Sequence, residues 1–95
     1  MSTADPRPYR VEFAEPARKQ FLALPRDAQR RIAPRVDALA QTPRPHGVEK
    51  LKGVEGLYRI RVGDYRVVYE IRDDVLLVLV VKVGNRRDVY RRKGD

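Results

Sequence analysis

Residues 57–90 read LYRIRVGDYRVVYEIRDDVLLVLVVKVGNRRDVY, and this stretch decides which fold the chain adopts. Two runs of alternating apolar and charged residues flank the Gly-Asp pair at positions 63–64, which suits the two-residue turn of a tight β-hairpin. With that turn, Arg61 lies opposite Arg66. Because side chains alternate between the faces of a strand, Arg59, Arg61 and Arg66 all point to one side. The other side is apolar enough to be buried, and it carries Tyr58, Ile60, Val62, Tyr65, Val67, Tyr69 and Ile71.

The three arginines form a surface that we call the arginine face: Arg59, Arg61 and Arg66. Like charges directly opposite each other on neighbouring strands destabilise a hairpin. A fold that keeps such a cluster without an acidic neighbour is typical of a surface that binds a polyanion. The alternative interpretation is that the long side chains spread into water, with Glu70 as a counter-charge.

A third strand is predicted over residues 75–83, after a second two-residue turn at positions 73–74. Its residues are apolar on both faces except for Lys82, which indicates a central strand covered on both sides. The Gly-Asn pair at positions 84–85 is expected to end this strand. A basic tail follows at residues 86–93, and we expect it to converge with the arginine face because both adjoin the same sheet.

The N-terminal half predicts one strand and two helices. Alternation over residues 9–13 indicates the strand, and Pro16 suits the first turn of the helix that follows. Pro25 ends that helix and opens a second one over residues 26–40. Pro34 lies inside the second helix, where we expect a kink or a break. The helix residues expected to face the core are Ala17, Phe21, Leu24, Ala28, Ile32, Val36 and Leu39.

A connector rich in proline and glycine, residues 41–56, joins the helices to the hairpin and is long enough to be a functional loop. The predicted fold is α+β, with two N-terminal helices packed on one face of a four-stranded, mainly antiparallel sheet in the order β-α-α-β-β-β. The arginine face then stays open. On that side Leu77, Leu79 and Val81 need a cover, which the C-terminal tail or a partner chain is expected to supply.

The composition limits the classes of function. A chain of 95 residues has room for one domain, predicted to span residues 1–95 with a loose lead at 1–8. Its 21 basic and 13 acidic residues leave a net charge of +8, which favours nucleic acid or an acidic protein as partner. Without cysteine, and with His46 as the lone histidine, we expect no metal and no cofactor. No secretory signal or membrane-spanning run is visible, so we expect a cytoplasmic protein with no membrane contact.

Four features occur together along this short chain. They are the opening strand with two helices, the Lys-Leu-Lys-Gly segment at 50–53, the hairpin at 58–69 and the ending VGNRRDVY at 83–90. Together they resemble the toxins of the RelE/ParE superfamily of type II toxin–antitoxin systems, over residues 9–92. The resemblance implies a RelE-like microbial ribonuclease fold. It also implies a ribosome-dependent endoribonuclease that cleaves mRNA by attack of the 2′-hydroxyl on the adjacent phosphate.

The resemblance assigns roles to residues at matching positions. Arg66 matches the arginine that stabilises the transition state, and Arg86 matches the arginine near the leaving group. Tyr90 matches the tyrosine that stacks on or orients the substrate, and Lys52 matches a basic residue that holds the RNA backbone. The expected catalytic residues are Arg61, Arg66, Arg86 and Tyr90, and the expected RNA phosphate-binding residues are Lys52, Arg59 and Arg87.

Arg59 and Arg61 are a departure, because the best-known ribonucleases of the family have lysines at these two places. Arginine has a pKa above about 12 and does not readily accept a proton, so both side chains are expected to clamp phosphate. Asn85 replaces a histidine that many relatives carry, which removes a further candidate for proton transfer. The remaining candidates for the general base are Glu70, Asp88, Tyr90, a ribosomal group and water.

Two other functions stay open at the level of sequence. The first is the other branch of the superfamily, toxins that act on DNA gyrase and have no nuclease activity. Arg86 and Tyr90 favour the nuclease, because the gyrase-directed branch commonly lacks this pair. The second is a binding module without activity, whose basic face serves RNA or an acidic protein.

The partners follow mainly from the resemblance. A toxin must be silenced in its own cell, so we expect a cognate acidic antitoxin whose helix or strand covers the arginine face or docks on the helices. The ribosome and mRNA are the other expected partners. Operator DNA is expected to be contacted only through the complex with the antitoxin.

Overall fold

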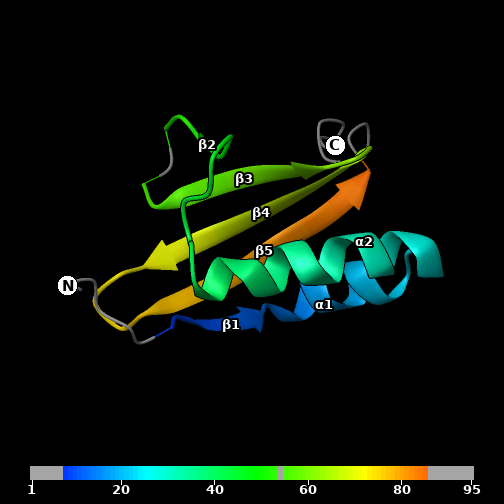
Figure 1. Cartoon of the computed structure of the whole chain (residues 1–95), viewed down its shortest axis with the longest axis horizontal. Helices are drawn as coiled ribbons and strands as arrows, with labels where there is room; N and C mark the ends of the chain where they lie inside the picture. The colour runs from blue at the N-terminus through cyan, green and yellow to red at the C-terminus, as the bar shows by residue number, and fades with distance from the viewer. Residues whose placement is uncertain (1–7, 54, 86–95) are drawn as a thin grey trace.

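The computed structural model describes residues 8–53 and 55–85 of the chain (Figure 1). Helices and strands follow the predicted order with one addition, a short strand ahead of the hairpin. The elements are β1 (Arg10–Phe13), α1 (Glu15–Leu22), α2 (Arg26–Asp37), the 3-10 helix η1 (Ala38–Ala40), β2 (Glu49–Lys50), β3 (Leu57–Val62), β4 (Tyr65–Arg72) and β5 (Leu77–Asn85). The predicted α+β class is therefore confirmed.

The strands form one mixed sheet of five strands in the order β1-β5-β4-β3-β2. β1 and β5 are parallel, and the other neighbouring pairs are antiparallel. The predicted count of four strands is corrected by β2, whose residues Glu49 and Lys50 pair with Arg59 and Tyr58 of β3. Two residues are too few to show a periodicity, which is why the connector carried no sign of a strand.

The β3–β4 hairpin has the register predicted from the sequence. Arg61 lies opposite Arg66, and Val62 lies opposite Tyr65. Gly63 in the turn has a φ of 61°, a left-handed conformation that glycine adopts at little cost. Both helices lie on one side of the sheet (Figure 1), so the arginine face is on the side that they leave uncovered.

β5 begins and ends later than predicted. The turn before it takes residues 73–76 instead of two residues, and Leu76 within this turn has a φ of 54°. At the other end, pairing with β4 continues through Gly84 and Asn85, so the predicted break there is wrong. The strand remains ordered because β4 supplies hydrogen-bonding partners along its whole length. Its predicted central position, between β1 and β4, is confirmed.

A β-bulge interrupts the alternation of side chains along β5. Val68 of β4 pairs with Lys82, but the next residue, Tyr69, pairs with Val80. Val81 is therefore the extra residue of the bulge. From this point onward the strand presents each side chain to the face opposite to that expected from simple alternation.

The bulge determines which residues of β5 enter the core. It moves Lys82 to the side of the arginine face and brings Val83 to the helix side, where only 3% of Val83 is exposed. Leu77 and Leu79 lie on the side of the arginine face as predicted, whereas Val81 lies at the bulge. The cover predicted from the tail falls on residues 86–95, outside the described part of the chain.

Both helices begin where the sequence predicts, but α2 ends before the predicted residue 40. α1 has Glu15 and Pro16 in its first turn, and Pro25 directly precedes α2. α2 passes through Pro34 without a break, and it ends at Asp37 before a short 3-10 turn. Burial of the residues on either side of this proline offsets the missing hydrogen bond. Within residues 8–53 and 55–85, no helix is long and apolar enough to cross a membrane.

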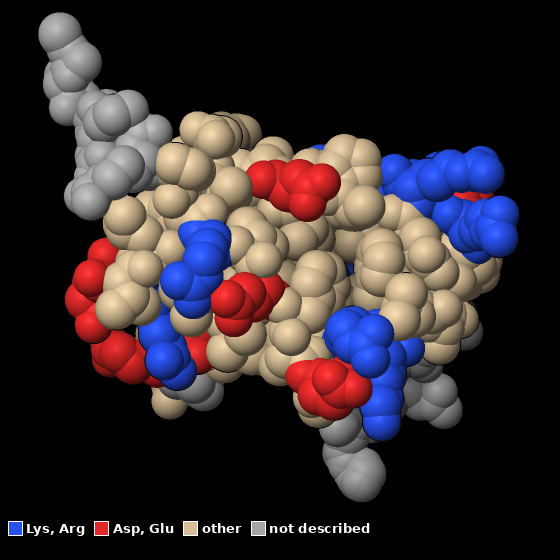
Figure 2. Space-filling view, turned by 90° about the horizontal axis from the view of Figure 1, so that it is seen from below, with Lys and Arg blue, Asp and Glu red and all other residues tan. Residues whose placement is uncertain are grey.

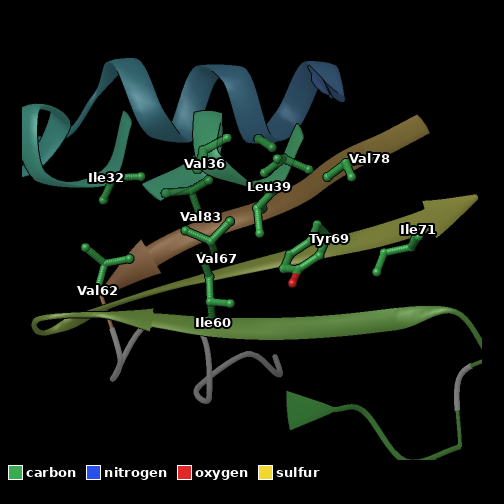
Figure 3. Packing of buried hydrophobic residues seen from close by; sticks show 12 residues of the cluster. Ile32, Val36, Leu39, Ile60, Val62, Val67, Tyr69, Ile71, Val78 and Val83 are labelled. Carbon is green, nitrogen blue, oxygen red and sulfur yellow. The ribbon is translucent and has the colours of Figure 1, made fainter. Parts of the chain in front are cut away.

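The core lies between the helices and the sheet (Figure 3). The predicted buried stripe is confirmed for Ile32, Val36 and Leu39, each at most 1% exposed, and they pack with Val67 and Tyr69 of β4. Full burial of one such side chain contributes about 1.5–3 kcal/mol, so this layer holds the hairpin firmly under the helices. The other predicted helix residues are also buried or partly buried: Ala17, Ala28, Phe21 and Leu24.

Candidate functional site

The candidate site is the arginine face, on the side of the hairpin away from the helices. Arg61 and Arg66 lie directly opposite each other beside the turn, so their Cβ atoms are about 5 Å apart. Arg61 is exposed, whereas only 6% of Arg66 is exposed. Gly84 lies opposite Arg66 on β5 and has no side chain, which leaves that part of the face to the guanidinium. The structure thus brings these two predicted residues together.

β2 adds a carboxylate to this face that sequence reasoning missed. Glu49 lies opposite Arg59, whose Nε and Nη2 donate hydrogen bonds to Oε1 of Glu49 at 2.9 and 2.5 Å. Glu70, the counter-charge of the alternative interpretation, instead accepts a hydrogen bond from Nε of Arg72 at 3.0 Å. The sequence carries no signal for this pair, since Glu49 lies on a strand of only two residues and its partner Arg59 is ten residues away on β3. Glu49 therefore supplies negative charge to the arginine face.

The arginine face lowers the pKa of Glu49. The hydrogen bonds from Arg59 are the main cause that lowers the pKa of this carboxyl below its usual value, and the charge of Arg59 adds to them. The charges of Arg61 and Arg66 lower it further. All three guanidinium groups therefore stabilise negative charge at the same point. A phosphate oxygen at this point would be stabilised in the same way.

Lys52 lies at the border of this face, in the loop between β2 and β3. The loop encloses an open hollow of about 680 Å³, lined by Lys50, Leu51, Lys52, Gly53 and Glu55. Both lysines are exposed. Because β2 pairs with β3 beside Arg59, Lys52 follows at the outer edge of the sheet, whereas Lys50 lies opposite Tyr58 and so faces the other side.

The predicted site residues of the C-terminal tail lie outside the described residues. They are Arg86, Arg87 and Tyr90, together with the candidate base Asp88. The described chain ends at Asn85, which pairs with Tyr65. The roles of the tail residues therefore remain predictions.

A polar cluster, which we call the connector clamp, holds the connector against the sheet. Nη1 and Nη2 of Arg44 donate to the two carboxylate oxygens of Asp73 at 3.2 and 2.9 Å, and the guanidinium lies 5.2 Å from the ring centre of Tyr58. The hydroxyl of buried Tyr69 donates to the carbonyl oxygen of Pro43 at 2.7 Å. Because the connector leads directly into β2, these contacts help to position the carboxylate beside the arginine face.

Two pKa values report on the connector clamp. Hydrogen bonds from Arg44, and then from Tyr9, lower the pKa of Asp73 below its usual value. Burial raises the pKa of Tyr69 to about 12. Both shifts favour the charge states that the contacts require at neutral pH, an ionised Asp73 and a neutral Tyr69.

The chemistry that the arginine face offers is fixed positive charge on forked N–H donors. Two parallel donors of one guanidinium match two oxygens of a phosphate, so such groups bind and orient phosphodiesters well. Within residues 8–53 and 55–85, no three side chains of the metal-binding types gather closely enough to hold a metal ion.

Comparisons with known proteins agree with this architecture. Residues 11–90 match the family model described as the ParE toxin of the type II toxin–antitoxin system parDE. A RelE-like toxin protein of Escherichia coli is 34% identical over 86 residues, which cover 86% of this chain and 90% of that protein. The mRNA interferase toxin RelE of Escherichia coli K12 is 29% identical over 86 residues, with the same two coverages, 86% and 90%. The RelE of the archaeal RelE–RelB complex from Pyrococcus horikoshii OT3 superposes with a TM-score of 0.73 at 33% identity, covering 84% of this chain and 97% of that chain.

Proposed function

The chain belongs to the RelE/ParE family of toxins of type II toxin–antitoxin systems, and from this premise we propose that it cleaves messenger RNA on the translating ribosome. In this proposal the arginine face holds the scissile phosphodiester. Related proteins named mRNA interferases support the reaction class. The observation that carries the proposal is the arrangement of Arg59, Arg61 and Arg66 on one face, where all three stabilise negative charge at Glu49.

The proposed reaction is an internal transesterification. The 2′-oxygen of the ribose forms a bond to phosphorus while the bond from phosphorus to the 5′-oxygen breaks, which leaves a cyclic phosphate and a 5′-hydroxyl. The proton of the 2′-hydroxyl passes to a base, and the 5′-oxygen gains a proton as it leaves. Negative charge builds on the equatorial oxygens, and guanidinium groups already in place stabilise it.

Each predicted residue takes a distinct part in this reaction. Arg66, buried and opposite Arg61, stabilises the equatorial oxygens in the transition state. Arg61 and Arg59 clamp the phosphate, and Lys52 holds the RNA backbone at the edge of the face. In the tail, Arg86 acts near the leaving oxygen, Tyr90 stacks on or orients a base, and Arg87 binds phosphate, and these assignments come from the family resemblance.

The proton acceptor is a separate group from the arginines, because a guanidinium does not give up its proton near neutral pH. Glu49 is ionised beside the arginine face, but its lowered pKa makes it a weak base. Glu70 is held by Arg72. We therefore assign the arginine face to the phosphate and not to the proton, and we leave the acceptor to the tail residues, the ribosome or water.

The proposed partners follow from the same site. Several similar structures are complexes of RelE with RelB, which supports a cognate antitoxin for this chain. The net charge of +8 favours an acidic antitoxin that covers the arginine face or docks on the helices. The toxin would act in the cytoplasm on ribosomes and mRNA, and it would meet operator DNA only through the antitoxin complex.

The test is a translating cell extract in which the 5′ ends of a reporter mRNA are mapped after toxin is added. Wild-type protein should produce discrete cuts, and Arg66→Gln should reduce their rate by about two orders of magnitude. Arg10→Gln is the matched control, because Arg10 is exposed on β1 at the opposite edge of the sheet and pairs with Glu12.

Two outcomes would contradict the proposal. Intact mRNA with altered plasmid supercoiling would identify the chain as a toxin directed at DNA gyrase. The match to the ParE toxin family is compatible with this second function. Equal cutting by the wild type and Arg66→Gln would remove the arginine face from the reaction.

A further inference from the structure

A second basic site lies on the helix side of the hairpin. A hollow of about 440 Å³ opens between α2 and the β3–β4 turn. We call it the α2 hollow, and its lining residues are Arg30, Arg31, Pro34, Arg35, Val62 and Gly63. Three positive charges thus surround a small apolar floor, which is a different surface from the arginine face on the other side of the sheet.

The arginines of the α2 hollow are not neutralised by the described part of the chain. None of Arg30, Arg31 and Arg35 forms an ion pair or a side-chain hydrogen bond with another residue of 8–53 or 55–85. Asp27 lies one helical turn before Arg31, a spacing that favours an ion pair, yet no such pair forms. Arg31 and Arg35 are also one turn apart and repel each other. This repulsion destabilises the helix when nothing is bound, and an anion held between the arginines would offset it.

Arg31 joins the α2 hollow to the turn of the hairpin. A Cβ atom built on Gly63 would lie 2.9 Å from Nη1 of Arg31, so the guanidinium lies directly against the turn and glycine leaves it room. Arg61 and Arg66 flank this same turn on the opposite face of the sheet. The two basic sites therefore meet at one end of the hairpin.

The surface charge at this end of the molecule suits a polyanion that extends from the arginine face to the α2 hollow. Figure 2 shows basic side chains gathered at the end where α1 meets α2, whereas basic and acidic side chains are interspersed over the rest of that side. The sequence places exposed Lys19, Arg26 and Arg30 close to this junction. Asp27 in the first turn of α2 and Asp64 in the hairpin turn are also exposed at this end, but the basic side chains outnumber them.

We propose that the α2 hollow binds the phosphate backbone of single-stranded RNA as it leaves the arginine face, so that one strand contacts both sides of the hairpin. This inference rests on the proposed function and extends its RNA site. Guanidinium forks suit phosphate, and apolar surface beside them accommodates a base. Because the two sites share one turn, the ligand of the arginine face is the natural ligand of the α2 hollow. This continuity favours RNA over an acidic peptide.

The test compares two variants that remove the same charge. Arg30→Gln/Arg35→Gln alters the α2 hollow, whereas Arg10→Gln/Arg18→Gln alters exposed arginines that pair with Glu12 and Glu15. The probe is a single-stranded RNA of about 12 nucleotides. Its 2′-oxygens are methylated so that it cannot be cleaved. Its affinity is measured by fluorescence anisotropy over a range of salt concentrations, and a trinucleotide serves as the short probe.

Arg30→Gln/Arg35→Gln should reduce the steepness with which log affinity for the long RNA falls against log salt concentration, by about 1.4. Each phosphate contact on a single strand contributes about 0.7 to this slope, and the variant removes two. The control variant should lower it less, and the trinucleotide should bind both variants alike. Equal slopes for the two variants would overturn this inference and leave the proposed function standing. Wild-type protein that does not bind the RNA would also overturn this inference, whereas the proposed function is overturned only by the absence of cuts in the translating extract. Loss of binding to a glutamate-rich peptide, with the RNA slope unchanged, would show that the α2 hollow serves a protein partner and would overturn the inference.

Discussion

Replacing Tyr69 with phenylalanine tests how firmly the connector is held to the sheet. Tyr69 is 0% exposed, and its hydroxyl donates to the carbonyl oxygen of Pro43 at 2.7 Å. The substitution removes that hydrogen bond and leaves the carbonyl without this donor, at a net cost of about 1 kcal/mol. For a domain of this size, that cost lowers Tm by about 4–8 °C.

The effect of this substitution should depend on pH in a defined direction. Burial raises the pKa of Tyr69 to about 12, whereas tyrosine in an unfolded chain ionises near about 10. The folded protein holds the neutral form, so this stabilisation is complete below pH about 10 and is lost as the pH rises towards about 12. At pH about 11 the loss is about 1.4 kcal/mol, enough to cancel the advantage of the hydrogen bond.

The assay is urea unfolding of the wild type and Tyr69→Phe at neutral pH and at pH about 11. The wild type should be more stable at neutral pH, and the difference should vanish or change sign at the higher pH. Tyr65→Phe is the matched control, because Tyr65 is partly buried and its hydroxyl has no hydrogen-bond partner among the described residues. A difference between the wild type and Tyr69→Phe that stays constant over this pH range would refute the reasoning.

Three further predictions concern Glu49, Asp73 and Gly63. Glu49→Gln should remove the negative charge beside Arg59 and tighten binding of uncleavable RNA, with a salt slope larger by about 0.7; weaker binding in the anisotropy assay would count against the role of Glu49. Asp73→Asn should cost at most about 1 kcal/mol, because the pair with Arg44 is about half exposed. Since the pKa of Asp73 is lowered, that difference should be present above pH about 4 and disappear as the pH falls through the folded-state pKa; a urea-unfolding difference that persists at low pH would contradict it. Gly63→Ala should destabilise the fold by about 1–2 kcal/mol because of the positive φ, and Gly63→Asn by less; equal stability of all three proteins in urea would disprove the strain.

Local patterns in the sequence predicted the hairpin and the helices correctly. The alternation in β3 and β4, with a Gly-Asp turn between them, specified the register that sets Arg61 opposite Arg66. The spacing of Ile32, Val36 and Leu39 specified the buried stripe of the helical segment. Both signals depend only on residues a few positions apart, so a single sequence contains them in full.

The features that local patterns could not reveal depend on contacts between distant segments. β2 is two residues long, and its pairing with Arg59 follows from the sheet and not from periodicity. The bulge at Val81 lies in a run of apolar residues that has no alternation to interrupt, so the sequence did not show that Val81 leaves the open face. The pairing of Glu49 with Arg59 depends on β2 and so could not be predicted, and Glu70 was the one carboxylate that the alternative interpretation named.

The most direct test of the central claim is the single-turnover rate of mRNA cleavage on the ribosome by the wild type and by Arg66→Lys. Lysine keeps the positive charge and loses the forked pair of donors. If the arginine face stabilises the transition state, Arg66→Lys should bind ribosomes as the wild type does but cleave about a hundredfold more slowly. This corresponds to an activation free energy that is higher by about 3 kcal/mol. Circular dichroism and thermal unfolding would establish that the variant is folded. A folded variant that cleaves at the wild-type rate would contradict the account.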